Sequence, residues 1–196
     1  VGTWIVGMGR YWDDPGAKLL QHLGLGSIIY IFVLAFIIWL IIQPYHVPNW
    51  TYFRVLTFIS LTSFPAIFYA IPVERFFAIT TANTINVWFL AIVAARRLAL
   101  LFFFLRRFTD LSIIQVLTTT LLPICVIIAS LTALNLHRVV FNIMGGVRNQ
   151  SAHDAAYLVL VFLTFASTFL VIPLLLSYII GVYGRWKNRR SKKEAQ

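Results

Sequence analysis

Acidic side chains are scarce in this chain, and their positions restrict its chemistry. Only six Asp and Glu residues occur among 196, and all six lie outside the long apolar segments. They are Asp13, Asp14, Glu74, Asp110, Asp154 and Glu194. Paired intramembrane carboxylates, which could serve as a general acid and base, are therefore excluded.

Sulfur chemistry is equally restricted, because Cys125 is the only cysteine. It cannot form an intrachain disulfide, and no CxxC motif offers a metal or redox site. Its position inside an apolar run is typical of a small buried hydrophobic residue. We therefore predict neither a metal site nor redox chemistry at this cysteine.

Motifs for catalysis and for haem are also missing. The sequence has no G-x-S-x-G, no P-loop and no HExxH motif, and we predict no catalytic residues. Its histidines fall at the ends of predicted helices or in loops, whereas axial haem ligands project into a helical bundle. They are His22, His46, His137 and His153. A haem cofactor is disfavoured, and an enzyme would need residues from loops or from a partner chain.

Charge is sparse overall, whereas apolar residues are abundant. Charged residues make up 11% of the chain and hydrophobic residues 60%, and the mean hydropathy is +0.86. Soluble domains are about 25% charged and could not bury so much apolar surface. The composition predicts an all-α, polytopic transmembrane helical bundle that uses lipid as part of its solvent.

Segments of about 20 apolar residues are long enough to cross a bilayer, and we expect about five of them. The predicted spans are residues 23–43, 53–73, 86–105, 111–134 and 156–183, which together form a bundle over residues 23–183. Prolines inside three spans predict kinked helices, at Pro65, Pro123 and Pro173. Residues 1–22 precede the bundle and form either a short interfacial helix or an extension of the first span.

The net charge of +10 comes largely from one end of the chain, because six of the sixteen Lys and Arg residues lie within residues 184–196. Such a basic tail is typical of the cytoplasmic face of a membrane, where it lies near anionic phospholipids, and nucleic-acid binding is disfavoured. With five spans, the side that carries the tail holds nine Lys and Arg residues and the other side five. The positive-inside rule then predicts a cytoplasmic C-terminus and an N-terminus outside.

Arg96 and Arg97 are the sharpest candidates for a functional site. If the third span is residues 86–105, both arginines lie near the bilayer centre, where one Arg costs at least about 2.5 kcal/mol. The alternative starts the span at Phe76, so that the arginines reach the interface by snorkelling. That alternative places the polar residues 80–86 in the middle of the bilayer, which is also unfavourable.

A buried arginine needs a partner, and no predicted span contains an acid. Hydroxyls, backbone carbonyls, a lipid phosphate, an anionic substrate or an acid on another subunit must serve instead. Hydroxyl residues precede the prolines in three spans, so we expect Thr62, Ser63 and Thr119 to join Arg96 and Arg97 in a polar site for an anion, lipid or partner. Ordinary interhelical packing also explains these hydroxyls.

Three alanines on the third predicted span, Ala91, Ala95 and Ala99, recur at four-residue spacing. Small residues at this spacing let a second helix approach closely. The second helix belongs either to this bundle, which is the commoner arrangement, or to another protein.

No motif here is specific enough to name a family. The sequence favours a noncatalytic subunit of a membrane protein complex, which packs against partner helices and lipids and meets an acid or lipid phosphate through Arg96 or Arg97. The alternative is a small permease or lipid-handling protein that binds an anionic substrate or headgroup at the arginine pair.

Overall fold

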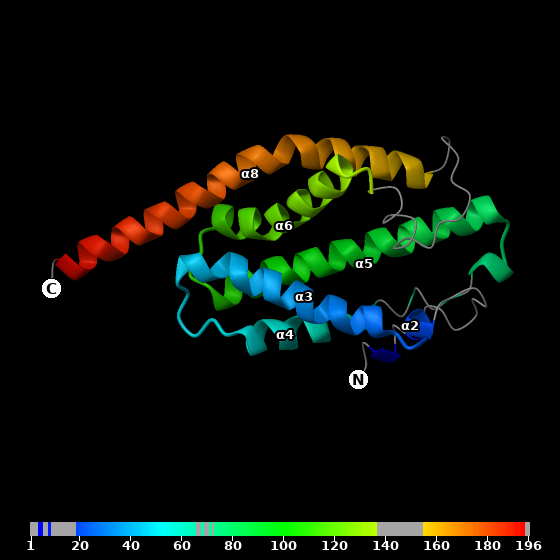
Figure 1. Ribbon diagram of the computed structural model, residues 1–196, viewed down its shortest axis with the longest axis horizontal. Coiled ribbons are helices and arrows are strands. Elements are labelled where there is room, and N and C mark those ends of the chain that lie inside the picture. The colour runs from blue at the N-terminus through cyan, green and yellow to red at the C-terminus, as the bar shows by residue number, and fades with distance from the viewer. Residues whose placement is uncertain are drawn as a thin grey trace.

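The computed structural model describes residues 4–5, 8, 19–65, 68, 71, 73–136 and 155–194 (Figure 1). Within these ranges the chain forms helices and their connections, with no strand. The elements are α2 (Leu19–His22), α3 (Leu25–Ile42), η1 (Gln43–Tyr45), α4 (Tyr52–Leu61), η3 (Val73–Arg75), α5 (Ile79–Phe108), α6 (Ile113–Ala133) and α8 (Ala155–Glu194). Most of the predicted N-terminal segment, residues 1–22, lies outside the described residues.

Four helices are long and apolar enough to cross a membrane. The candidate spans are Leu25–Tyr45, Thr80–Phe108, Ile113–Ala133 and Tyr157–Ser191. They correspond to four of the five segments expected from the sequence and support an integral, multi-pass membrane protein. In the second predicted span, residues 53–73, the structure has the 10-residue helix α4. The fifth span and the proline kinks stay predictions.

Arginine side chains of α8 show which helix ends lie together. Arg185 donates to the backbone oxygens of Tyr45 and Asp110, and Arg189 donates to the His46 oxygen at 2.7 Å. The C-terminal ends of α3 and α5 and the segment of α8 around Arg185 therefore share one end of the bundle, where α6 begins. We call this the basic end. Beyond it, α8 projects past the other helices toward the C-terminus (Figure 1).

The main core lies between α3, α4 and α5. One face of α3 is buried, at the helical spacing of Ile31, Ala35, Ile38 and Ile42. It belongs to one cluster with residues of α4 and α5, and the rings of Phe58 and Phe104 stack there at 4.1 Å between centroids. In this cluster α4 packs mainly against α3, and its Phe58 reaches Phe104 in the C-terminal half of α5.

The most extensive helix contact in the described fold is between α6 and α8. Ser112 starts α6 with a capping box, in which it and Gln115 each accept the other's backbone N–H. Along the interface, the hydroxyls of Thr118 and Ser177 are 3.0 Å apart. Both helices continue through an internal proline, Pro123 in α6 and Pro173 in α8.

Two local features concern the predicted helix limits. Gly24 has φ 63°, a left-handed conformation that suits glycine, and it separates α2 from α3.

The third predicted span lies within α5, which begins at Ile79 and so includes the polar residues 80–86 as helix. At 1.5 Å per residue its 30 residues are about 45 Å long, more than a hydrocarbon core of about 30 Å. The register 86–105 therefore lies wholly inside this helix, whereas the register that begins at Phe76 starts three residues before it.

Candidate functional site

Arg96 and Arg97 lie on one helix but face different surroundings. Both are within about 5 Å of the midpoint of α5 along its axis. Arg97 is half-buried on the side that contains the buried residues Val93, Leu101 and Phe104, whereas Arg96 is exposed. Because neighbouring helical positions differ by about 100°, the two side chains leave α5 in different directions.

Arg97 reaches the C-terminal end of α4. Its Nε donates to the backbone oxygen of Thr62 at 3.3 Å. The Thr62 and Ser63 hydroxyls donate to the Ile59 oxygen, at 3.1 and 2.8 Å, and Ser63 is buried. The partner of this arginine is thus a backbone carbonyl at the end of a helix, where carbonyls lack intrahelical donors. Arg97 thus contacts the backbone of Thr62, whereas the Thr62 and Ser63 hydroxyls, which the sequence suggested as its partners, donate to Ile59 instead.

Thr119 does not join this group by any described contact. It is buried on α6, and its Oγ1 donates to the backbone oxygens of Gln115 and Val116 at 2.8 and 3.0 Å. A hydroxyl that satisfies itself against its own helix needs no ligand to be stable in an apolar interior. In the described part of the chain, Thr119 is a buried residue of α6 whose hydroxyl contacts only its own helix.

Arg96 lies beside an uncovered face of α5. Ala91, Ala95 and Ala99 are all exposed, so no helix in the described part of the chain covers the small-residue stripe. Trp88 and Ile92, on the same face, are 64% and 55% exposed. Arg96 makes no hydrogen bond or ion pair with any described residue.

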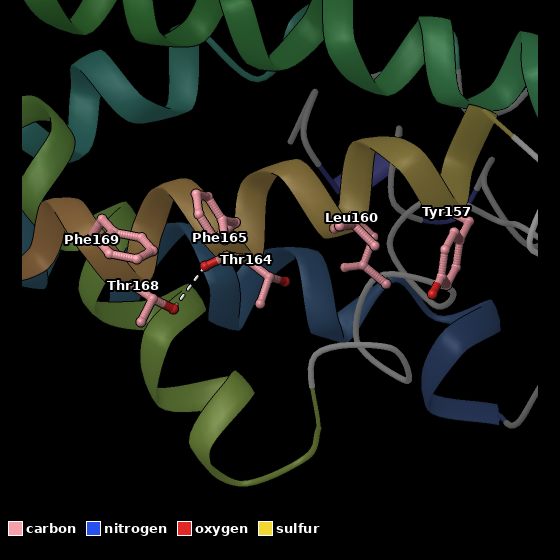
Figure 2. Close-up of a pocket in the computed structure, with 7 residues that line it drawn as sticks. Tyr157, Leu160, Thr164, Phe165, Thr168 and Phe169 are labelled. Atoms are coloured by element: carbon pink, nitrogen blue, oxygen red, sulfur yellow. Dashed lines mark hydrogen bonds between the residues drawn. The ribbon is translucent and has the colours of Figure 1, made fainter.

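A groove on α8 is lined by seven residues of that helix alone, with a volume of about 280 Å³ (Figure 2). Its polar atoms come from Tyr157, Thr164 and Thr168. The Thr168 hydroxyl donates to the backbone carbonyl oxygen of Thr164 at 2.8 Å. The Thr164 Oγ1 is buried and has no hydrogen-bond partner in the described part of the chain. This groove is small and mostly apolar, and it contains neither arginine.

A second groove, which the sequence did not predict, lies between α4 and the C-terminal part of α5. It has a volume of about 470 Å³ and is lined by Phe53, Arg54, Thr57, Phe58, Leu61, Phe104 and Phe108. Arg54 is its only charged residue and donates to the Asn49 oxygen at 2.9 Å. The available signal was the helical spacing of Phe53, Thr57 and Leu61 on one segment and of Phe104 and Phe108 on another.

The basic end gathers the positive charge that the sequence assigned to one side of the membrane. Its described cations are Arg54, Arg106, Arg107, Arg185, Lys187, Arg189 and Arg190. Two of them have local partners: Arg106 donates to the Leu111 oxygen in the connection to α6 at 3.0 Å, and Arg190 lies 3.8 Å from the ring centre of Trp186 on the same helix. Among the described residues, no group of three or more His, Cys, Asp or Glu is placed to hold a metal ion.

Comparison with known protein families, with curated proteins and with solved structures found no match for this chain.

Proposed function

We propose that this protein is a noncatalytic subunit of a membrane protein complex and that the exposed face of α5 receives a helix of the partner. The observation that carries the proposal is the position of Arg96, exposed near the middle of α5 beside three exposed alanines. An arginine at that depth is costly unless an opposite charge or a hydrogen-bond acceptor meets it.

The alanines explain how a partner helix comes close enough. Ala91, Ala95 and Ala99 form a strip without bulky side chains, and such strips allow helix backbones to approach closely in lipid. Since no predicted span of this chain contains an acid, the counter-charge for Arg96 comes from outside the chain. We infer a partner span that carries an Asp or Glu.

The alternative of a small permease or lipid-handling protein that uses the arginine pair has less support. Neither groove described above includes Arg96 or Arg97. The one polar contact in its favour is that of Arg97 with Thr62, and this contact uses a backbone carbonyl of the chain itself.

The test is to compare substitutions on and off the alanine strip. Arg96→Leu and Ala95→Leu should dissociate the complex, so that the solubilised protein migrates on native gels at the size of the single chain. Ala94→Leu adds the same bulk at a neighbouring exposed position and should leave the complex intact. Photo-crosslinking from position 95 should identify a partner span with an acid, and exchanging the charges of that acid and Arg96 should restore assembly.

Unchanged assembly in both Arg96→Leu and Ala95→Leu would contradict the proposal. So would a crosslinked partner segment without an Asp or Glu near the reacting position.

A further inference from the structure

We propose that the groove between α4 and α5 binds one acyl chain of an anionic glycerophospholipid, with its phosphate held by Arg54. This groove is distinct from the exposed face of α5 that carries Arg96. The inference therefore does not depend on the proposed partner subunit.

The walls of the groove suit a hydrocarbon chain. Phe58 of α4 and Phe104 of α5 stack at 4.1 Å, with an angle of 9° between their ring planes, and so fix the two walls relative to each other. The only hydroxyl is that of Thr57, and it donates to the Phe53 oxygen of its own helix at 2.8 Å. The lining thus offers no hydroxyl hydrogen to a polar ligand, whereas an alkyl chain requires none.

The shape argues against a helix as the occupant. Close packing of a second helix in lipid needs small residues, and the groove is lined by four phenylalanines with no Gly or Ala. Phe53 and Leu61, at its two ends along α4, are 77% and 73% exposed. From Arg54 to Leu61 the groove extends about 10 Å along the helix axis, which accommodates the upper part of one acyl chain.

Arg54 supplies the charge that selects the headgroup. Its guanidinium lies 6.0 Å from the centre of the Phe108 ring, and its Nη1 donates to the Asn49 oxygen. An arginine has five N–H donors in a fork that matches phosphate oxygens, and no further hydrogen bond of Arg54 to described residues uses them. The guanidinium is exposed and remains available at the mouth of the groove.

The surroundings of Arg54 favour an anionic over a zwitterionic lipid. Seven described Lys and Arg residues lie at the basic end, against the acids Asp110 and Glu194. Their summed field attracts lipids with net negative charge to this leaflet. The aromatic groove then retains one such lipid, rather than the diffuse layer that any basic surface would attract.

The experiment is native mass spectrometry of the full chain, released from detergent containing equal amounts of palmitoyl-oleoyl phosphatidylglycerol and palmitoyl-oleoyl phosphatidylcholine. We expect one retained phosphatidylglycerol. Arg54→Gln should weaken its apparent affinity about tenfold, the effect of losing one charge-assisted hydrogen bond. Thr57→Trp, which fills the groove from an exposed position, should abolish retention while leaving Arg54 in place.

Two matched controls separate the groove from general effects. Arg190→Gln removes the same charge from the basic end outside the groove, and Ile114→Trp adds the same ring at an exposed position of α6. Both should retain the lipid as the unmodified chain does. The proposal is overturned if Arg190→Gln weakens retention as much as Arg54→Gln, if phosphatidylcholine is retained equally, or if Thr57→Trp has no effect. Displacement of the lipid by millimolar inorganic phosphate would also overturn it, because the binding would then not depend on the acyl chain.

Discussion

At the scale of single residues, the two adjacent arginines have different tasks because helix geometry turns them to different sides of α5. Arg97 donates to the backbone of Thr62 and connects α5 with α4, whereas Arg96 is exposed beside the alanines. From the sequence we interpreted Arg96 and Arg97 as a pair, because the sequence shows that they are adjacent but not on which side of α5 the neighbouring helices lie. The positions of the other helices leave Arg97 half-buried and Arg96 exposed.

Gly181 is a second residue whose importance depends on its neighbours. A Cβ at this position would lie 3.0 Å from the Tyr45 hydroxyl oxygen and 3.4 Å from Gln115 Cγ, so three helical segments meet there. We expect Gly181→Val to destabilise the protein by about 1–3 kcal/mol, because overpacking forces neighbouring side chains to move. Thermal unfolding in detergent, followed by tryptophan fluorescence, measures this loss.

Gly184 provides the control for that substitution. It lies on the same helix, and a Cβ there would have nothing within 4 Å. Gly184→Val should therefore leave the unfolding temperature unchanged or raise it slightly, since valine has a better helix propensity than glycine. Equal destabilisation by both substitutions would show that the close approach of Gly181 to Tyr45 and Gln115 is not the cause of the lost stability.

At the scale of helices, the α6–α8 interface combines apolar packing with hydroxyl contacts. The Thr118 and Ser177 hydroxyls are 3.0 Å apart and form a hydrogen bond across the interface. Interhelical hydrogen bonds in membrane proteins contribute modestly, because the separated helices find other partners for the same groups. Their value is in fixing which residues of two long apolar helices face each other.

A double-mutant cycle on Thr118→Val and Ser177→Ala measures this contribution. We expect a coupling energy of about 0.6 kcal/mol, and not above about 1.7 kcal/mol. Thr168→Val is the control, since that exposed hydroxyl donates only to its own helix, at the Thr164 oxygen. A coupling energy near zero would mean that the Thr118–Ser177 contact does not help to align α6 and α8.

The length of α4 bears on the number of membrane crossings. Its 10 residues are about 15 Å long, roughly half of a hydrocarbon core. However, the C-terminal ends of α3 and α5 share the basic end, so the chain must return to the opposite end before α5 begins. The second predicted span falls within this return between Tyr45 and Ile79, and α4 is its described helix; a fifth crossing there stays a prediction.

At the scale of the whole molecule, the distribution of charge predicts the orientation in the membrane. In a Cys125→Ser background, a membrane-impermeant maleimide should label Ser191→Cys and Asp110→Cys only from the cytoplasmic side, and Ala78→Cys only from outside. All three native positions are exposed, and Arg185 connects the first two regions through its contact with Asp110.

Two results would contradict that expectation in different ways. Labelling of Ser191→Cys from outside would invert the orientation but preserve the bundle. Labelling of Ser191→Cys and Asp110→Cys from opposite sides would contradict the arrangement of α5 and α8 itself.

The sequence by itself determined the class of protein, four of the helices and the concentration of charge at one side. These follow from local composition: a run of about 20 apolar residues must satisfy its backbone internally when it lies in lipid, and an α-helix does so. The sequence places Arg54, Arg106 and the C-terminal tail on one side, because this grouping needs only the number of crossings between them, and the sidedness stays a prediction.

Only the tertiary structure decided which faces of those helices are covered. Leu98 and Ala99 are adjacent in an apolar run, yet the first is partly buried and the second exposed. Because lipid tails are as apolar as leucine, hydropathy does not distinguish a side chain that faces lipid from one that faces a neighbouring helix. The uncovered alanines beside Arg96 and the aromatic groove ending at Arg54 depend on that distinction, and so they became visible only when the helices were assembled.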